Sequence, residues 1–466
     1  MIYNNCFDTD VLVVGGGLGG LAAALGSARA GAKTMLLERN TYLGGVATAG
    51  MCCSVFNCLF TRGRKLAVLG IPLEITDLLA DSGGPGMSWR RHKGHVIYDL
   101  ELAKLSLDKL AQNNAVQLLL ETMVTDVAKE NGRLTGVRFI GKGGAGTISA
   151  KAVVDATGDS DVAHMAGAPL ITIPREGFSR SSYCFRMGNV DLDGFVDYFR
   201  NNPGQYPELM DIEWSLAEAL AQYEDNGTFL FPHGGGMQMD IMKKGIESGE
   251  LKLSLGVYDT MDATQMHGIR NTKIMHIVTG YTKISLDAFD ISRAITDGRE
   301  MAHHAAQFMR KRMPGFENAF VCGFADNLGI RASRYIHGDF VFTAQMKSTP
   351  SRFEDAIGQG VVEVQQKLHK AKNAWGAQIF GDDVYQIPYR CLLPRNVDGL
   401  IMGAGRSVSA DNPYLLRVMA TTMTIGQAAG IAAATSAKEG EELRRLDVCT
   451  IQRELAAQGV DLTRDF

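Results

Sequence analysis

Four residues near the N-terminus have the types and spacing needed to hold the phosphates and ribose of a dinucleotide. Gly15, Gly17 and Gly20 match the pattern G-x-G-x-x-G, and Glu38 follows them. Gly15 permits a tight turn, Gly17 lets backbone approach a pyrophosphate, and Gly20 lets a helix pack closely on a strand. Glu38 is placed to accept hydrogen bonds from a ribose. These residues predict dinucleotide binding, but the motif alone does not separate NAD from FAD.

The elements that must position these residues form a βαβ unit. Residues 11–14 are predicted as a buried strand, residues 21–30 as a helix rich in alanine and leucine, and residues 33–37 as a second strand. The helix would point its N-terminal amides and positive dipole end at the phosphates. The alternative is an ordinary βαβ unit with a tight glycine turn.

Three further glycine-rich stretches lie far apart in the chain. Gly44-Gly45 begins a loop that continues through Ala47, Thr48 and Gly50. A predicted strand over 152–156 ends in Thr157-Gly158-Asp159, and another over 400–402 ends in Gly403 and Gly405. The segment after Arg406 predicts a helix from about residue 415, with small residues that allow tight packing on a sheet. They are Ala420, Gly426, Ala429, Gly430 and Ala433.

The order of the elements between these stretches is informative. We predict a helix over 99–112, a strand over 116–120, and three short strands over 123–128, 134–140 and 146–149, before the strand over 152–156. Asn131-Gly132 and the glycines of 141–146 supply the turns. The predicted order is a βαβ unit, an antiparallel meander and a strand ending in ATGD. This order differs from the plain NAD-binding arrangement.

This arrangement resembles the FAD-binding domain of the glutathione-reductase-like flavoproteins. More broadly, the chain is similar to the FAD-dependent oxidoreductases, a family of mostly bacterial proteins distantly related to fumarate-reductase flavoproteins and the tRNA-modifying flavoprotein GidA. The resemblance runs from residue 8 to about 434. It rests on stretches such as ERNTYLGGVATAG, VVDATGDSDVAHMAGAP, LGIRASRYIHGD and IPYRCLLPRNVDGLIMGAGRSVSA. These motifs are specific for FAD and poor guides to substrate.

The resemblance implies noncovalent FAD and the residues that hold it. The residue matching Val124 would meet the adenine through its backbone, and the ATGD glycine would lie near the phosphates or ribityl chain. The N-terminus of the last long helix would face the flavin and stabilise negative charge on the reduced ring. The implied cofactor-binding residues are Gly15, Gly17, Leu18, Gly19, Gly20, Glu38, Arg39, Gly45, Val46, Ala47, Thr48, Val124, Ala156, Thr157, Gly158, Asp159, Gly405, Arg406, Val418 and Met419.

The predicted fold class is α/β, with a Rossmann-like FAD-binding domain that carries a three-stranded β-meander and an inserted α+β substrate or cap domain. We expect the FAD-binding domain to occupy residues 1–167 and 381–440. The cap would occupy 168–380, and 441–466 would form a C-terminal tail helix. Within the cap, 273–284 has the alternation of a strand, and 286–312 has helical spacing.

Candidate catalytic residues come from the cap and from the last glycine-rich stretch. His233 lies in an HGGG loop, whereas His276 lies within a predicted strand and favours a structural role. Arg331 and Arg334 would share a face if they lay on a helix; they would either clamp a carboxylate or tie the cap to the FAD-binding domain. Arg417 and Tyr414 lie beside the predicted flavin.

Two features bear on these assignments. Many relatives carry a histidine-containing segment where this chain has residues 411–414, so no role is carried over there.

Cys53 and Cys58 have the C-x-x-x-x-C spacing of disulfide-handling flavoproteins, but their register after Gly44-Gly45 is shifted. Cys52, Cys53 and Cys58 are therefore either apolar fillers or a redox group.

Composition narrows the functional classes. The chain has 466 residues, 45% hydrophobic and 21% charged, with a net charge of −4 and eight cysteines. These values predict a globular protein in a reducing cytoplasm, without nucleic-acid or membrane partners. The first ten residues have no signal-peptide pattern. We find no metal-ligand spacing and no second complete dinucleotide motif, and we leave open whether the chain forms a homo-oligomer.

Together these observations predict a soluble enzyme that transfers a hydride between flavin N5 and a small polar substrate, with an anionic or hydroxylated one favoured by the arginines. An unidentified electron acceptor or donor would complete the cycle. Two alternatives stand beside this prediction. One is flavin-linked thiol–disulfide exchange through Cys52, Cys53 and Cys58. The other is a non-catalytic or RNA-modifying flavoprotein.

Overall fold

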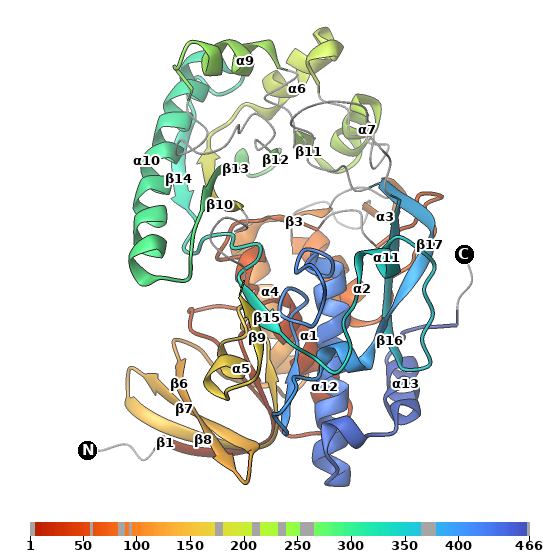
Figure 1. Ribbon diagram of the computed structural model, residues 1–466. Coiled ribbons are helices and arrows are strands. Elements are labelled where there is room, and N and C mark those ends of the chain that lie inside the picture. Colours follow the sequence, from red (N-terminus) through yellow and green to blue (C-terminus); the bar gives the residue numbers. More distant parts are fainter. Residues whose placement is uncertain are drawn as a thin grey trace.

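The computed structural model describes residues 5–55, 59–82, 89–92, 96–172, 180–206, 215–231, 239–251, 265–364 and 379–463. His233 and Cys58 lie outside these ranges. The described chain forms two parts, each built on its own large sheet, and the smaller part lies above the larger one in Figure 1. We refer to them as the FAD-binding domain and the cap, after the predictions above.

The FAD-binding domain is built on a seven-stranded sheet in the order β5-β2-β1-β8-β7-β6, with β18 pairing to β8. Strands β5, β2, β1, β8 and β18 are parallel, whereas β6, β7 and β8 form an antiparallel meander. Val11 to Val14 are at most 3% exposed because helices and sheet enclose this strand on both faces. The strands are β1 (Asn5–Val14), β2 (Thr34–Leu37), β5 (Gln117–Leu119), β6 (Met123–Glu130), β7 (Arg133–Gly141), β8 (Gly144–Asp155) and β18 (Leu400–Met402).

Two helices cross next to this sheet with their backbones almost in contact. They are α1 (Leu18–Arg29) and α12 (Met419–Glu439). A Cβ on Gly426 would lie 2.0 Å from the carbonyl oxygen of Gly19, and one on Gly430 would lie 1.9 Å from that of Ala23. Small residues on α12 therefore set how closely the helices approach. Around them lie α2 (Ile71–Ser82), α4 (Leu100–Asn113) and α13 (Val448–Ala457), whereas α5 (Asp161–Met165) packs on β6 and β8.

The cap is built on an antiparallel sheet in the order β11-β12-β13-β10-β14. The long helix α10 (Ala288–Arg312) runs along this sheet (Figure 1). Phe195, Phe199 and Phe229 stack edge-on or face-on in its aromatic core. The other elements are β10 (Arg180–Gly188), β11 (Thr228–Phe231), β12 (Gln265–Ile269), β13 (Ile274–Lys283), β14 (Phe320–Phe324), α6 (Leu192–Asn201), α7 (Leu216–Asn226) and α9 (Asp240–Glu247).

Short elements connect the two parts. β15 (Arg334–Ile336) pairs with β9 (Leu170–Thr172), and the hairpin of β16 (Ala356–Val364) and β17 (Ile379–Pro388) lies beside α12. The smallest pieces are β3 (Ser54–Val55), β4 (Val96–Ile97), α3 (Trp89–His92) and α11 (Ala344–Lys347). The fold class predicted from the sequence, a Rossmann-like domain with a meander and an α+β cap, is confirmed.

Three local predictions were wrong. The strands expected over 146–149 and 152–156 are one strand, β8, because β1 pairs with it continuously from Asn5 opposite Gly146 to Val14 opposite Asp155. The last long helix begins at Met419 rather than near residue 415. Leu415 closes a turn with Asn412, and Val418 then occupies the N-cap position. Arg331 and Arg334 do not share a helix: Arg334 begins β15, where pairing with β9 imposes an extended backbone.

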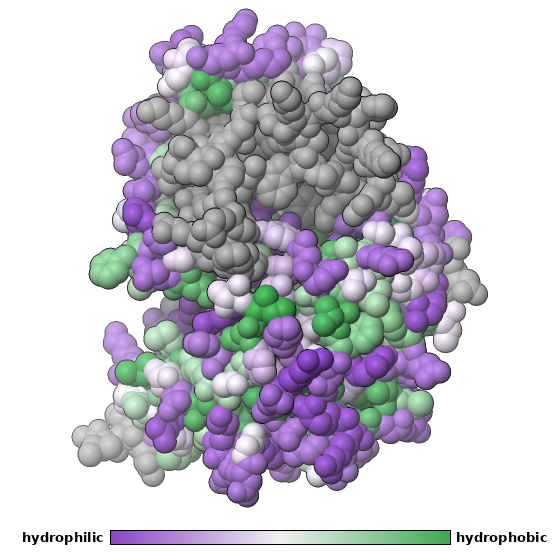
Figure 2. All heavy atoms as spheres, in the orientation of Figure 1, coloured by the Kyte–Doolittle hydropathy of each residue, from purple (hydrophilic) through white to green (hydrophobic). Residues whose placement is uncertain are grey.

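The surface mixes polar and apolar residues. Hydrophilic residues cover most of the lower part of the face in Figure 2, with apolar residues among them. Among the described helices, none combines the length and apolarity needed to cross a bilayer.

Candidate functional site

The glycine-rich stretches come together at one edge of the large sheet. Gly15 follows β1, Glu38 follows β2, Thr157 follows β8 and Gly403 follows β18. These strands are parallel, so their carboxyl ends lie at the same edge. In open α/β sheets this edge is where ligands bind.

The loops at this edge touch one another. A Cβ on Gly15 would lie 2.6 Å from the carbonyl oxygen of Ala156, and one on Gly19 would lie 2.5 Å from that of Gly403. The Gly44 amide donates to Gly16 O at 2.8 Å. Segments separated by hundreds of positions in sequence therefore form a single turn-rich surface.

Gly17 and the start of α1 have the features of a phosphate cradle. A Cβ on Gly17 would meet no atom within 4 Å, unlike one on Gly20, which would lie 1.8 Å from Gly15 O. Gly17 is the N-cap of α1, and no described side chain caps this end of the helix. The space above Gly17 and the uncapped amides fit the pyrophosphate of a dinucleotide.

Glu38 is buried beside this cradle. One of its carboxylate oxygens accepts a hydrogen bond from Gly16 N at 2.6 Å, and the other accepts from Asn40 N and Asn40 Nδ2 at 2.8 and 2.7 Å. The acid therefore lies against the glycine turn, where it would reach a bound ribose. Ala47 and Thr48 are buried nearby, with Thr48 Oγ1 donating to Leu43 O, whereas Val46 is 42% exposed.

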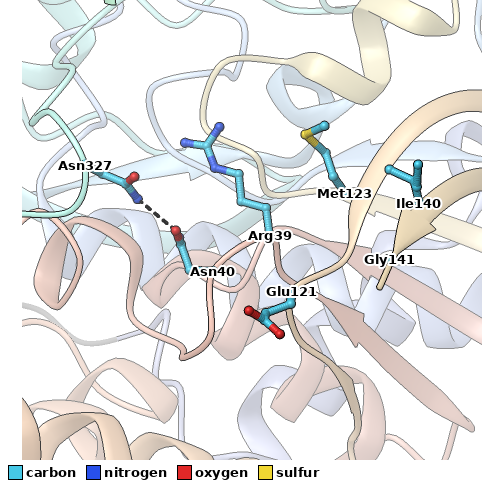
Figure 3. A pocket seen from close by; sticks show the side chains of 7 residues that line it. All are labelled: Arg39, Asn40, Glu121, Met123, Ile140, Gly141 and Asn327. Carbon is cyan, nitrogen blue, oxygen red and sulfur yellow. Dashed lines mark hydrogen bonds between the residues drawn. The ribbon is translucent and has the colours of Figure 1, made fainter. Parts of the chain in front are cut away.

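A cavity of about 500 Å³ opens beside Glu38 at the adenosine end of the predicted site. Figure 3 shows the Arg39 side chain between the Asn40–Asn327 pair on one side and Met123 and Ile140 on the other. Met123 and Ile140 are about half exposed. Apolar walls with a flanking guanidinium suit a flat heterocycle. The residues Arg39, Asn40, Glu121, Met123, Ile140, Gly141 and Asn327 line this cavity.

The N-terminus of α12 is a second helix start beside these loops, since a Cβ on Gly19 of α1 would lie 2.8 Å from Thr422 Cγ2. Val418 is its N-cap, and no described side chain caps the helix. A Cβ on Gly405 would lie 1.9 Å from Leu416 O, so the strand exit and the helix start are in contact. The amides at Met419 and beyond are therefore free of side-chain caps, as the stabilisation of a reduced flavin by this helix requires.

Arg406 and Arg334 both brace the turn after β8. Arg406 donates to Gly158 O, to Ile330 O and to the Asp159 carboxylate. Arg334 donates to Asp159 O and to the Asp161 carboxylate. Of the two roles predicted for Arg334, tying the cap to the FAD-binding domain is therefore the one that its contacts support. Arg406 holds the Gly158 turn in place through its guanidinium.

Arg331, Arg417 and Tyr414 are brought to one region. The Arg417 guanidinium lies 5.5 Å from the centre of the Tyr414 ring. Burial raises the pKa of the Cys52 thiol, while the positive charges of Arg331 and Arg417 act in the opposite direction. Both guanidinium groups therefore lie near Cys52, which follows the Gly44-Gly45 loop.

Cys52 and Cys53, the two described members of the predicted redox group, do not have the properties of an exchanging dithiol. Burial raises the pKa of Cys52 and, more strongly, that of Cys53. Cys53 is fully buried, and its thiol lies 3.5 Å from Nδ1 of His267. Thiol exchange needs an accessible thiol with a lowered pKa, so the described geometry disfavours this alternative. Among the described residues, no group of histidine, cysteine and acidic side chains has metal-binding geometry.

His276 and the His303-His304 pair lie in different surroundings. His276 is buried within β13 and 1% exposed, and His303 and His304 are exposed on α10. Sequence patterns gave no signal for Tyr42 and Asp326, whose side chains are hydrogen-bonded. They also gave none for Asn327, which lines the cavity from the cap and donates a hydrogen bond to Asn40, 287 positions earlier in the sequence. These contacts join a loop after β2 to a loop after β14.

Comparison with known proteins adds distant relatives. The chain is 28% identical over 204 residues to a digeranylgeranylglycerophospholipid reductase of Thermoplasma acidophilum, covering 41% of this chain and 50% of that protein. It is 32% identical over 166 residues to a thiamine thiazole synthase of Methanococcus aeolicus, covering 34% and 57%. The chain thus spans about half the length of these curated relatives.

A solved geranylgeranyl bacteriochlorophyll reductase-like protein of Thermoplasma acidophilum aligns with 97% of this chain and 83% of its own, with a TM-score of 0.45 and 14% identity. The FAD dependent oxidoreductase family matches residues 10–455, which include every glycine-rich loop at the edge of the sheet. The uncapped α1 and α12 ends, the open space above Gly17 and the buried Glu38 are what such a cofactor requires. The chain belongs to the FAD dependent oxidoreductase family.

Proposed function

We propose that this protein transfers a hydride between N5 of noncovalently bound FAD and a small polar organic substrate, with an anionic or hydroxylated one favoured. The observation that carries the proposal is the convergence of four loops and two uncapped helix N-termini at one sheet edge. FAD supplies the hydride chemistry when it is bound. The protein supplies binding, orientation and charge.

Different residues of this chain would bind the adenosine end and the flavin end of FAD. The α1 amides and Gly17 would hold the pyrophosphate, Glu38 the ribose, and the cavity at Arg39 the adenine. The N-terminal amides of α12 would stabilise negative charge at the flavin end.

Arg331 and Arg417 would provide the preference for an anionic substrate. The positive charges of both act to lower the pKa of the Cys52 thiol, and Cys52 follows the Gly44-Gly45 loop of the proposed FAD site. A carboxylate held there by guanidinium hydrogen bonds would be oriented as well as attracted. Tyr414, packed against Arg417, would limit the movement of that side chain. His233, which lies outside the described residues, remains a candidate for proton transfer.

The cap would close the site from above. Its sheet meets the FAD-binding domain near Cys53 and Ser54, and a covered site excludes water from hydride chemistry. The partners we propose are a small-molecule substrate and a separate electron acceptor or donor. The cytoplasm remains our predicted location. Reductase names among the relatives make substrate reduction the first direction to test.

The first experiment is the absorption spectrum of the purified protein, before and after denaturation and filtration. Flavin bands that pass into the filtrate and are identified as FAD would support noncovalent binding. Anaerobic bleaching of these bands by candidate substrates, or their return after dithionite reduction, would then report turnover. A colourless protein that takes up no added FAD would refute the proposal.

A further inference from the structure

The face of the cap sheet that meets the FAD-binding domain carries a row of polar side chains. In the strand register, Arg186 of β10 lies opposite His276 of β13, which lies opposite His267 of β12. His267 contacts Ser54 Oγ at 3.1 Å, and Arg186 donates to Glu101 of α4 at 2.9 Å. These two contacts with the FAD-binding domain establish which way the row faces.

Gln265 belongs to the same face. It lies two positions before His267 on β12, and alternate residues of a strand point to the same side. Its register partner is Val278, which lies two positions after His276 on β13. Gln265 and His276 are therefore diagonal neighbours on adjacent strands, within reach of a common ligand.

Several polar atoms on this face are buried and lack a hydrogen-bond partner among the described residues. They are Nε2 of Gln265, Nε of Arg186 and both ring nitrogens of His276, on which the His267 backbone acts without a hydrogen bond of standard geometry. Gln265 and His276 are each 1% exposed. Buried polar groups are usually satisfied, and each exception calls for an explanation. A cluster of such exceptions on one face suggests that a ligand completes it.

The chemistry of the row defines the ligand. Gln265 and Arg186 each offer an N–H donor, and Arg186 adds positive charge. Burial, reinforced by Arg186, lowers the pKa of His276 to about 3, so its ring stays neutral and offers one donor and one acceptor. Glu101 and Lys104 pair at the outer end, and His267 and Cys53 lie at the inner end. Unmatched donors outnumber unmatched acceptors, which favours an oxygen-rich anion.

We propose that Gln265, His276 and Arg186 bind a second carboxylate of the substrate, apart from the one at Arg331 and Arg417, an inference that rests on the proposed function. The row spans two strand spacings, about 10 Å, which suits a short acid with polar groups at both ends. Because these side chains are nearly enclosed, the ligand would reach them while the cap is displaced from the Cys53–Ser54 segment. Return of the cap would then enclose it.

The test uses FAD-loaded protein, with glutarate as the probe and its neutral diamide as the chemical control. Binding is measured by calorimetry and by the melting temperature. The variants are Gln265→Leu and His276→Leu, which remove the unmatched groups. The matched control is Gln222→Leu, a cap glutamine that is equally buried but donates to Thr228 Oγ1 at 2.8 Å.

We expect glutarate, and not the diamide, to bind the wild type. Gln265→Leu and His276→Leu should each weaken glutarate binding about tenfold or more and leave the melting temperature of the unliganded protein unchanged or higher. Gln222→Leu should lower the melting temperature and leave glutarate binding intact. Wild-type protein that binds FAD but not glutarate, or variants that bind it within about twofold of wild type, would overturn the inference. Failure to bind FAD would instead refute the proposed function.

Discussion

The Tyr42 hydroxyl donates a hydrogen bond to the Asp326 carboxylate and so joins the two parts of the molecule. Tyr42 lies in the loop after β2, next to the residues that would hold the adenosine, and Asp326 lies just after β14 of the cap. The amides of Asp326 and Asn327 also donate to Ala49 O, at 2.9 and 3.1 Å. The cap loop is thus fastened over the proposed FAD site, and Asn327 reaches its cavity.

Replacing Tyr42 by Phe should weaken this fastening. The change removes one hydrogen bond to a carboxylate at a half-buried position, which corresponds to about 1 kcal/mol. We expect FAD to dissociate about fivefold faster, because the loop carrying Asn327 would open more often. The increase in flavin fluorescence after dilution measures this rate.

Tyr198→Phe is the control for that comparison. Tyr198 lies on α6 of the cap, and none of the hydrogen bonds identified among the described residues involves its hydroxyl. It should release FAD at the wild-type rate. Equal rates for Tyr42→Phe and wild type would show that the fastening does not control cofactor release.

Gly17→Ala and Gly20→Ala should separate cofactor binding from folding. Gly17 has φ −63°, and a Cβ there has open space in the protein. The Gly17→Ala apoprotein should therefore melt like wild type but bind FAD at least about tenfold more weakly, since the methyl group occupies the phosphate space. Gly20→Ala would place a Cβ 1.8 Å from Gly15 O and should destabilise the apoprotein itself.

Paired melting curves and FAD titrations check both variants. A Gly17→Ala protein with wild-type FAD affinity would place the phosphates elsewhere.

Asp155 should make stability depend on pH. Its side chain is fully buried at the end of β8, where it accepts hydrogen bonds from Thr157 and Ala163. Burial raises its pKa from 3.8 to about 6. Between these values the folded protein binds a proton that the unfolded chain does not, so this group stabilises the fold increasingly as the pH falls through 6.

Asp155→Asn removes this titration. Relative to the variant, the wild type should gain about 1 kcal/mol of unfolding free energy between pH 7.5 and pH 5. Urea unfolding of both apoproteins at the two pH values gives the comparison, and contributions from the other titrating groups largely cancel. A wild-type-minus-variant difference that stays constant with pH would contradict the raised pKa.

Thiol labelling should distinguish the buried cysteines from the exposed ones. Cys6 and Cys449 are exposed, whereas Cys53 and Cys184 are buried and have raised pKa values. At pH 7.5 we expect iodoacetamide to label Cys6 and Cys449 at least about tenfold faster than Cys53 and Cys184, as determined by peptide mapping. Labelling in urea is the control that equalises access. Fast labelling of Cys52 in the folded protein would reopen the dithiol alternative.

The local sequence was sufficient to predict a structural feature wherever the residues of one short segment determine that feature. The turn at Gly15 and the acid at Glu38 follow from residue types that only a narrow set of backbone conformations and ligands requires, whereas α1 begins at Leu18 and not at residue 21 as predicted. The strand over 400–402 was predicted with its observed bounds for the same reason, because an apolar run followed by glycine is a local signal. The FAD assignment rests on several such signals and is supported by the family match.

Features that depend on pairing between distant segments were decided only by the tertiary structure. β8 is one strand because β1 pairs with it from Gly146 to Asp155, and Arg334 braces Asp161 because β15 pairs with β9. Asn327 reaches the cavity, and Gln265 and His276 share a face, through contacts that no spacing along the chain encodes. Residue type determined which chemistry was available to this protein. The way the loops and short elements of the two parts meet determined which groups come together, because contacts between distant segments depend on the whole fold.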